Sequence, residues 1–373
     1  MVDDQEEVVS AEVRDYYFGG SGREVTLAAN RQGWDAIELW PRALAAVGVP
    51  DLGASLASLD LPTPLIVAPM AYLSLLRPKA EAVVAEEAAK RGISFCLSTR
   101  SGMPLEEVAE AWRAGAGSVN DGGRAARLLL QIYAMRDVRL TNSLVDRAVA
   151  AGFDAIMITV DTPYIGLRYR DRENGFAVPA ELLNANLQTE LAMAVQGVGQ
   201  PSFGTGVSSA ANAALAQDPA FGWAEFTELV ARAGPLPSIA KGVLHPADIA
   251  AALSAGACAV VISNHGGRQL DGSPSTASAL YRAGRDVAWP RRVMMVDGAI
   301  ASGADVLRAV ALGAGTVMVG RSLARALADG GRSGVATAMD LLLDDLLSSA
   351  AIFGISNLAA ISRESVSLPP AWG

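Results

Sequence analysis

A histidine and an arginine stand three residues apart in the run Ser263–Arg268 (SNHGGR), whose glycines predict a tight turn. Histidine suits the role of general base near neutral pH. Arginine presents a planar fork of N–H groups that matches a carboxylate. The only other histidine, His245, directly precedes Pro246 and is predicted to begin a helix. His265 is therefore the candidate base, and Arg268 is a candidate ligand for an acidic substrate.

A second candidate site lies in the segment Gly320-Arg321-Ser322, which follows an apolar run. Backbone N–H groups at the start of a helix bind anions, and a neighbouring arginine adds positive charge. Phosphate sites of (β/α)8 barrels are built in this way. The segment predicts a phosphate site, although the same pattern fits many phosphate-binding barrels.

Polar residues follow nearly every apolar run from residue 93 onward. They are Ser98, Gln131, Tyr133, Thr159, Asp161, Lys241, Ser263, Asp297, Gly298, Gly320 and Arg321. Loop solvation explains any one of them as well as function does. It explains the set poorly, because the carboxyl ends of parallel strands meet at one edge, where barrel enzymes place their active sites.

Eight short apolar runs are predicted to be the strands that position these residues. They are Leu65–Ala68, Ile93–Leu97, Leu128–Ile132, Ala155–Val160, Ser238–Ala240, Ala259–Ile262, Val293–Val296 and Thr316–Val319. Their continuous apolar character is typical of parallel strands buried on both faces. Amphipathic helical patterns lie between them. The repeat predicts an α/β TIM (β/α)8 barrel over residues 61–350, with an open doubly wound sheet as the alternative.

Two segments fall outside the repeat. Residues 1–60 are predicted to form an N-terminal helical cap, with helices at Ala11–Phe18 and Glu24–Gly33. The connection 164–235, after the fourth strand, is far longer than an ordinary loop, and its middle, 196–218, is rich in Gly, Ala and Ser. We expect an active-site loop followed by a mobile stretch. The whole chain of 373 residues is predicted to be one domain.

Composition argues against several classes of protein. The net charge is −9 and no basic patch is present, so nucleic acid is not expected as a partner. No apolar run is long enough to span a membrane, and Met1–Glu7 is acidic, which predicts a cytoplasmic protein without a signal peptide. Cys96 and Cys258 lie in apolar runs and are predicted to be buried thiols. A structural zinc site usually needs four Cys or His ligands close together, whereas the two cysteines and two histidines here are spread along the chain, so no metal is expected.

The turn at His265 resembles that of the FMN-dependent 2-hydroxy-acid oxidases and dehydrogenases. This family includes glycolate and lactate oxidases, mandelate dehydrogenases and hydroxymandelate oxidases. The resemblance runs from about Asp15 to about Ala350. Further matching segments are Asp15-Tyr16-Tyr17, Gly19–Gly22, Ala68–Ala71, Gln131–Tyr133, Thr159–Pro163, Gly166–Arg168, Lys241–Val243, Asp297-Gly298 and Gly320-Arg321.

The resemblance implies oxidation of an L-2-hydroxy acid to the 2-oxo acid, with electrons passed to O2 to give H2O2. In such an enzyme His265 takes a proton from the substrate, Asp161 stabilises the histidine, and Tyr133 contacts the substrate oxygen. The residues implied to hold the substrate carboxylate are Tyr16, Arg168 and Arg268. The family also tends to form tetramers, so a homo-oligomer is expected.

FMN is the cofactor that the resemblance implies. The chemistry agrees, because no side chain can accept the two electrons that leave a 2-hydroxy acid. Lys241 is implied to stabilise the negative charge that develops on the flavin. The other implied cofactor-binding residues are Pro69, Met70, Ala71, Ser98, Gln131, Thr159, Ser263, Asp297, Gly298, Gly320 and Arg321.

Three positions depart from the family's usual pattern. Ala301 stands where an arginine usually follows the Asp-Gly pair, so one positive charge near the phosphate is missing. Met70 replaces a small polar residue beside the flavin, and Arg100 replaces an aromatic residue that some members carry near the substrate. The run Arg170–Phe176 resembles that of members that oxidise hydroxymandelates. These features imply a specialised enzyme with a bulky aromatic substrate.

Three other functions stay open at this point. The first is a 2-hydroxy-acid dehydrogenase that uses another electron acceptor. The second is a non-redox, phosphate-binding barrel isomerase or synthase, which would be colourless and would not need His265, Asp161 and Lys241 together. The third is a flavin-binding protein without turnover, against which the complete set of candidate residues argues.

Overall fold

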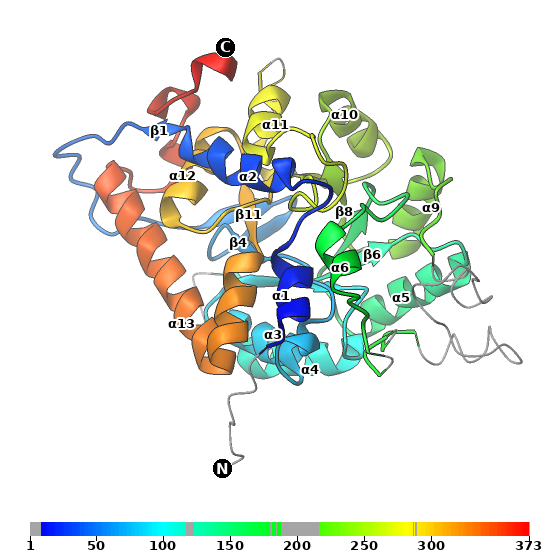
Figure 1. Cartoon of the computed structure of the whole chain (residues 1–373). Helices are drawn as coiled ribbons and strands as arrows, with labels where there is room; N and C mark the ends of the chain where they lie inside the picture. The colour runs from blue at the N-terminus through cyan, green and yellow to red at the C-terminus, as the bar shows by residue number, and fades with distance from the viewer. Residues whose placement is uncertain are drawn as a thin grey trace, which may run out of the picture.

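Eight parallel strands close into a barrel surrounded by helices (Figure 1). The computed structural model describes residues 9–116, 123–179, 181–183, 185–187, 216–285, 287 and 289–372. The order around the barrel is β10, β11, β4, β5, β6, β7, β8 and β9. Their bounds are β4 Leu65–Val67, β5 Ser94–Ser98, β6 Leu128–Tyr133, β7 Ala155–Thr159, β8 Ser238–Val243, β9 Ala259–Ile262, β10 Met294–Val296 and β11 Thr316–Val319.

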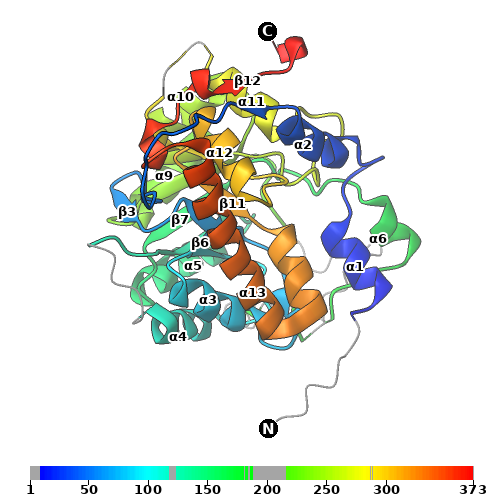
Figure 2. The same ribbon diagram turned by 90° about the vertical axis from the view of Figure 1, so that its left-hand side faces the viewer.

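Helices follow the strands as the predicted repeat requires. Around the barrel they are α3 Ala80–Lys90, α4 Leu105–Ala116, α5 Val138–Ala150, α9 Trp223–Ala233, α10 Pro246–Ser254, α11 Thr276–Ala283, α12 Gly303–Ala311 and α13 Arg321–Phe353. Figure 2 shows α13 running along one side of the molecule, past α3 and α12. Its axis breaks at Gly331, whose φ of 55° interrupts the helical backbone.

The barrel has an inner and an outer apolar core. Alternate strand residues such as Ile66, Met157 and Met318 form the inner core. Leu56 and Leu61, from the hairpin β2 (Ala54–Leu56) and β3 (Leu59–Leu61), belong to the same cluster. The hairpin lies at the N-terminal ends of the strands, where the Ala57 amide donates to the Arg292 carbonyl. This end is therefore closed by apolar side chains, which leaves the carboxyl ends of the strands for the site.

The N-terminal segment packs against the carboxyl end of the barrel. It contains α1 (Ala11–Phe18) and α2 (Val25–Asp35), within a residue or two of the predicted helices. Ser10 caps α1 by accepting a hydrogen bond from the Val13 amide. Both views place α1 beside α6 (Tyr169–Glu173), a short helix from the loop after β7 (Figures 1 and 2). The short strands β1 (Glu38–Leu39) and β12 (Val366–Ser367) pair near the C-terminus.

The predicted barrel is confirmed, including all eight strands to within a few residues. The predicted insertion 164–235 is less irregular than expected, because its end contains α9, the regular barrel helix that follows β7. Most of its predicted mobile middle, residues 196–215, lies outside the described residues. Among the helices described, none has both the length and the hydropathy needed to cross a bilayer.

Candidate active site

His265 follows β9 and lies within hydrogen-bond range of two predicted partners. Its Nδ1 lies 3.0 Å from Asp161 Oδ1, and its Nε2 lies 3.4 Å from the Tyr133 hydroxyl oxygen. The residue has a left-handed backbone, with φ 57°, which is unusual for a residue with a Cβ. The His265 amide donates to Ser263 Oγ at 3.0 Å, which supports this conformation. The structure therefore brings these three predicted site residues together.

Asp161 is held by the loop after β7 and by a bulge in β8. The strand register shifts between Lys241 and Val243, and Gly242 adopts a φ of +107°. A Cβ at Gly242 would lie 2.5 Å from Asp161 Cγ, so the close approach requires glycine. Burial raises the pKa of Asp161, but the attraction of His265 outweighs it and leaves that pKa below its usual value. Asp161 is therefore an anion that fixes and stabilises the His265 ring.

Tyr133 ends β6 and presents its hydroxyl to the same space. Burial raises the pKa of Tyr133 to about 12, so the phenol is neutral at physiological pH. A neutral phenol can donate a hydrogen bond to an oxygen atom while His265 removes a proton nearby. The Tyr133 amide donates to Thr99 Oγ1, which anchors the end of the strand.

Lys241 forms a buried cluster with two of the predicted cofactor-binding residues. Its Nζ donates to Ser263 Oγ at 3.1 Å and lies 3.1 Å from Asp297 Oδ2. Ser263 Oγ also lies 2.8 Å from Asp297 Oδ2. Burial lowers the pKa of Lys241, but the neighbouring carboxylates of Asp297 and Asp161 together raise it by more. The net pKa lies above its usual value, so the ammonium stays charged. The cluster places a fixed positive charge inside the carboxyl end of the barrel.

Three further predicted cofactor-binding residues form a chain across neighbouring strands. Ser98 Oγ donates to Gln131 Oε1 at 3.2 Å, and Gln131 Nε2 donates to Thr159 Oγ1 at 2.8 Å. All three side chains are buried. Because each end of the chain is a hydroxyl, the set can both donate to and accept from a planar, polar ring.

Two arginines hold the C-terminal end of α1. Arg268 Nη1 donates to the Tyr16 and Gly19 carbonyls at 2.5 and 3.0 Å, and Arg321 Nε donates to the Tyr17 carbonyl at 3.1 Å. The last carbonyls of a helix lack partners within the helix and attract cations. Within the described residues both Arg268 bonds use Nη1, which leaves Nε and Nη2 for an anion. Arg321 begins α13, as predicted.

The arginines at this edge lie close enough to repel one another. Burial, aided by Arg168, lowers the pKa of Arg268 to about 9. Burial also lowers the pKa of Arg321 to about 10. Arg168 Nη1 lies 3.7 Å from Asp171 Oδ2, which balances only part of this charge. Buried cations without matching anions are costly, so the site is suited to anionic ligands.

Tyr16 brings the arginines and α6 together. The guanidinium carbons of Arg168 and Arg268 lie 5.6 and 5.1 Å from the centre of its ring. Phe176, which follows α6, stacks on the same ring with 4.6 Å between centroids. This stacking was not predicted, because it joins residues that are 160 positions apart in the sequence.

The residues present fit FMN. Among the described residues, Arg168 Nε, Asp171 Oδ1 and Asp297 Oδ1 are buried without a hydrogen-bond partner. Buried polar atoms are normally satisfied, so these atoms are suited to bound ligands. Asp297 Oδ1 suits a ribityl hydroxyl, while Arg321 and the first amides of α13 suit a phosphate. A Cβ at Gly320 would lie 3.5 Å from Met70 Sδ, so the Pro69–Ala71 loop closely approaches this helix start.

Ala301 stands where the family usually has an arginine, and a different set of hydrogen bonds holds the turn around it. The Ala301 amide donates to Asp305 Oδ2 at 3.1 Å, and Arg31 Nη1 donates to both Asp305 and the Ala299 carbonyl. Arg308 donates to the Ile37 carbonyl and to Asp305, so it is part of the same network. His245 caps α10 by accepting from the Ala247 amide, which confirms its predicted structural role.

Sequence reasoning missed Tyr72. This buried residue has a φ of 54°, and its carbonyl accepts a hydrogen bond from the Tyr17 hydroxyl. Its amide donates to the Arg100 carbonyl at 2.7 Å. No motif marked Tyr72, since the contacts depend on loops after two different strands.

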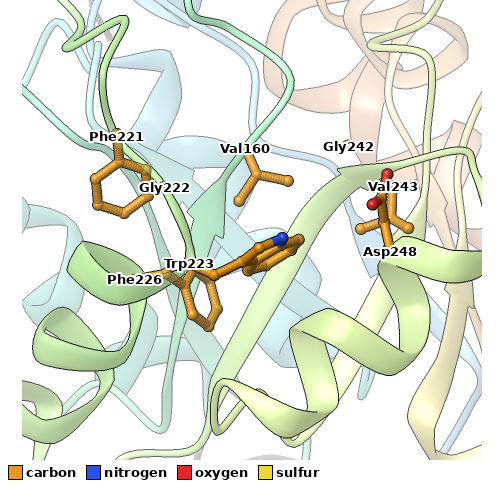
Figure 3. Close-up of a pocket in the computed structure, with 8 residues that line it drawn as sticks. All are labelled: Val160, Phe221, Gly222, Trp223, Phe226, Gly242, Val243 and Asp248. Carbon is orange, nitrogen blue, oxygen red and sulfur yellow. The ribbon is translucent and has the colours of Figure 1, made fainter.

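A cavity of about 250 Å³ lies beside the catalytic cluster, lined in part by Val160 and Gly242. Figure 3 shows the rings of Phe221, Trp223 and Phe226 on one side and the Asp248 carboxylate on the other. Among the described residues that line it, Asp248 is the only titratable group, and none is a predicted site residue. The cavity is therefore distinct from the cluster around His265.

The chain matches known proteins over nearly its full length. The family model described as FMN-dependent dehydrogenase matches residues 5–368. An L-lactate oxidase of Nostoc sp. is 38% identical over 349 residues, which cover 93% of this chain and 91% of that protein. A 4-hydroxymandelate oxidase of Amycolatopsis orientalis is 36% identical over 362 residues, covering 96% and 94%.

Solved structures agree with these matches. Mandelate oxidase with (S)-4-hydroxymandelic acid superimposes with a TM-score of 0.82 at 34% identity, covering 96% of this chain and 95% of that chain. A mandelate oxidase mutant with a C4a-OH-FMN adduct superimposes with a TM-score of 0.81 at 33% identity, covering 97% of both chains. The motif at His265, the geometry around it and these matches lead to one conclusion: the chain belongs to the FMN-dependent dehydrogenase family and uses FMN as its cofactor.

Proposed function

We propose that this protein oxidises an L-2-hydroxy acid to the corresponding 2-oxo acid and passes the electrons to O2. The substrate loses two protons, one from its hydroxyl and one from C2, together with two electrons, and O2 takes up two protons and two electrons to become H2O2. The observation that carries the proposal is the line of Asp161, His265 and Tyr133 beside buried arginines.

The reacting groups have separate roles in this proposal. His265 removes a proton from the substrate, and Asp161 stabilises the imidazolium that results. Tyr133 donates a hydrogen bond to the substrate oxygen. Arg168 and Arg268 bind the carboxylate beside the Tyr16 ring, since a carboxylate accepts paired hydrogen bonds from a guanidinium.

The residues proposed to bind the cofactor lie at and just beyond the carboxyl ends of the barrel strands. When bound, FMN supplies the acceptor for two electrons that no side chain can provide. Lys241 places a fixed ammonium where negative charge develops. The further residues proposed to hold the cofactor are Pro69, Met70, Ala71, Ser98, Gln131, Thr159, Ser263, Asp297, Gly298, Gly320 and Arg321.

We propose an aromatic substrate of the hydroxymandelate kind. Support comes from the stack of Phe176 on Tyr16, which lines the carboxylate-binding arginines with aromatic surface. Met70 adds a deformable apolar side chain nearby. The similarity to 4-hydroxymandelate oxidase and to mandelate oxidase is consistent with this choice.

One anaerobic experiment tests the activity. The purified holoenzyme is mixed with glycolate, lactate, mandelate or 4-hydroxymandelate, and the bleaching of the flavin absorbance is followed. We expect the two aromatic acids to bleach it faster than glycolate does. If no 2-hydroxy acid bleaches the flavin, the proposed activity is wrong, and if glycolate is the best of the four, the aromatic substrate class is wrong.

A second candidate is a dehydrogenase that uses another acceptor, as the name of a similar L-lactate dehydrogenase of Caulobacter vibrioides indicates for that protein. Admitting oxygen to the bleached enzyme separates the two. An oxidase recovers its flavin colour within the time of one turnover and forms one H2O2 per substrate. A dehydrogenase recovers slowly and needs an added acceptor.

We also propose a cytoplasmic homo-oligomer. Support for the assembly comes from exposed apolar side chains, including Trp40, Leu44 and Val49. Light scattering of the holoenzyme tests it, and a monomeric mass at micromolar concentration would contradict it.

A further inference from the structure

Arg100 lies at the carboxyl end of the barrel, on the opposite side of the ring from His265. It follows β5, while His265 follows β9, and these strands are four positions apart in a ring of eight. The two residues therefore approach the site from opposite walls. The Arg100 amide donates to Ser98 Oγ at 3.1 Å, which turns the chain directly after the strand.

Arg100 stands between two tyrosines at this edge. Its side chain hydrogen-bonds that of Tyr72, which follows β4, and the field of its charge reaches Tyr133 at the end of β6. β4 and β6 are the two neighbours of β5 in the barrel. Arg100 is a partly buried residue. A cation, with phenol groups on both sides, thus forms the wall opposite the base.

The position of the carboxylate-binding residues fixes the direction of the substrate. Arg168 follows β7 and Arg268 follows β9, so both approach from the wall that also carries His265. If the carboxylate binds there, as the proposed function has it, the third substituent on C2 extends toward the opposite wall. Tyr72, which follows β4, and Arg100, which follows β5, are two polar groups on that wall whose side chains hydrogen-bond each other.

From this arrangement we infer that Arg100 is a specificity-determining residue, and that the substrate is a 2-hydroxy acid whose C2 substituent ends in an oxygen acceptor. A guanidinium binds such an oxygen with two parallel N–H groups, and Tyr72 orients the guanidinium. The acceptor has two chemical sources: the carboxylate of a dicarboxylic 2-hydroxy acid, or the phenolic oxygen of a hydroxyaryl 2-hydroxy acid. This inference rests on the proposed function.

Matched substrate pairs test the inference and separate the sources. L-2-hydroxyglutarate is compared with L-2-hydroxyvalerate, which has five carbons but no second carboxylate, and 4-hydroxymandelate is compared with mandelate. We expect at least one pair to show a preference of about tenfold to a hundredfold in kcat/KM for the oxygen-bearing member. In Arg100→Leu this preference falls to about twofold or less, and Arg100→Lys retains part of it.

The control is Arg139→Leu, because the Arg139 side chain on α5 is 78% exposed and lies outside the site. This variant should keep the wild-type preference. FMN content and circular dichroism are measured for every variant, so a folding defect is recognised. If neither pair shows a preference, or if the preference survives in Arg100→Leu, the inference is wrong.

Binding measurements distinguish failure of this inference from failure of the proposed function. The affinities of 2-oxoglutarate and 2-oxovalerate are measured from the change in flavin absorbance that they cause without turnover. We expect the dicarboxylate or, with the corresponding aryl 2-oxo acids, the phenol to bind at least about tenfold more tightly, and only when Arg100 is present. Equal affinities overturn the inference even if the flavin is readily bleached by 2-hydroxy acids.

Discussion

His265 combines a left-handed backbone with one hydrogen bond from its amide and two contacts of its ring. We expect His265→Gln to retain FMN but to lose flavin reduction by about 10²–10⁴-fold, because a positioned base contributes about that much. Stopped-flow bleaching by the best substrate measures it. His245→Gln is the matched control and should be nearly silent, since His245 only caps α10. If His265→Gln reduces its flavin at a rate within threefold of the wild type, His265 is not the base.

Arg268 predicts an unusual pH dependence. Its pKa is lowered to about 9, so the guanidinium is charged below that pH and neutral above it. The charged form binds the substrate carboxylate, and kcat/KM should therefore fall as the pH rises through about 9. A profile of kcat/KM against pH reports this pKa of the free enzyme. A plateau that continues well above pH 9, as an ordinary arginine would give, contradicts the assignment.

Ala301 predicts weak retention of FMN. The network of Arg31 and Asp305 holds the turn, but Arg31 also pairs with Asp35 at the surface. A missing charge-assisted hydrogen bond is worth about 1.5–3 kcal/mol, so Ala301→Arg should tighten FMN by about tenfold to a hundredfold. Fluorescence titration of the apoprotein with FMN measures the dissociation constant. Complete retention of FMN by the wild type after long dialysis, with no gain in the variant, would show that other groups supply the charge.

At the scale of elements, the contact of α6 with α1 lies beside the residues proposed to bind the substrate carboxylate. Arg170 pairs with Asp15 and Glu24 at 3.3 and 2.5 Å, two residues beyond Arg168. These pairs are partly exposed, so their contribution is about 1 kcal/mol or less. We expect Arg170→Gln to raise KM by up to about fivefold while kcat stays within twofold.

Steady-state kinetics on the best 2-hydroxy acid checks this element. Arg172→Gln, at an exposed position of the same helix, serves as the control and should leave both constants unchanged. A large loss of kcat in Arg170→Gln, without a change in KM, would mean that α6 acts on the chemical step instead.

The strands and the catalytic cluster could be predicted because they follow local rules. Continuous apolar runs mark buried parallel strands, and polar residues at their ends meet by the geometry of the barrel. The partners of Tyr16 could not be found in this way. Phe176 reaches it through the fold of α6, and Tyr72 reaches Arg100 across two loops. Such contacts depend on tertiary structure, and no periodicity in the sequence encodes them.

The exact ends of helices and strands also could not be predicted from the sequence pattern. The Glu24–Gly33 prediction ends two residues before α2 does, and the pattern at Ser238–Ala240 misses the last three residues of β8. The latter include Lys241 and the glycine bulge, where a charge and a positive φ interrupt the apolar run. The interruption is itself functional, because the bulge lets Asp161 approach the barrel.

At the scale of the whole molecule, cofactor binding and folding are coupled. A ligand that binds only the folded state adds about 2.7 kcal/mol at a hundred times its dissociation constant. We therefore expect saturating FMN to raise the melting temperature of the apoprotein by about 5 °C or more. Differential scanning calorimetry measures it, with riboflavin, which lacks the phosphate, as the matched control. If riboflavin raises the melting temperature as much as FMN does, Arg321 and α13 do not bind the phosphate.

The first barrel strand, β4, pairs with the last, β11, so the ring is complete only when both are present. The carbonyls at the C-terminal end of α1 accept hydrogen bonds from Arg268, which follows β9, and from Arg321, which follows β11. During translation, α1 leaves the ribosome some 300 residues before Arg321 does. A nascent or truncated chain that lacks β11 thus has neither a closed ring nor a phosphate-binding helix. We therefore expect flavin chemistry only after β11 and the start of α13 have been synthesised.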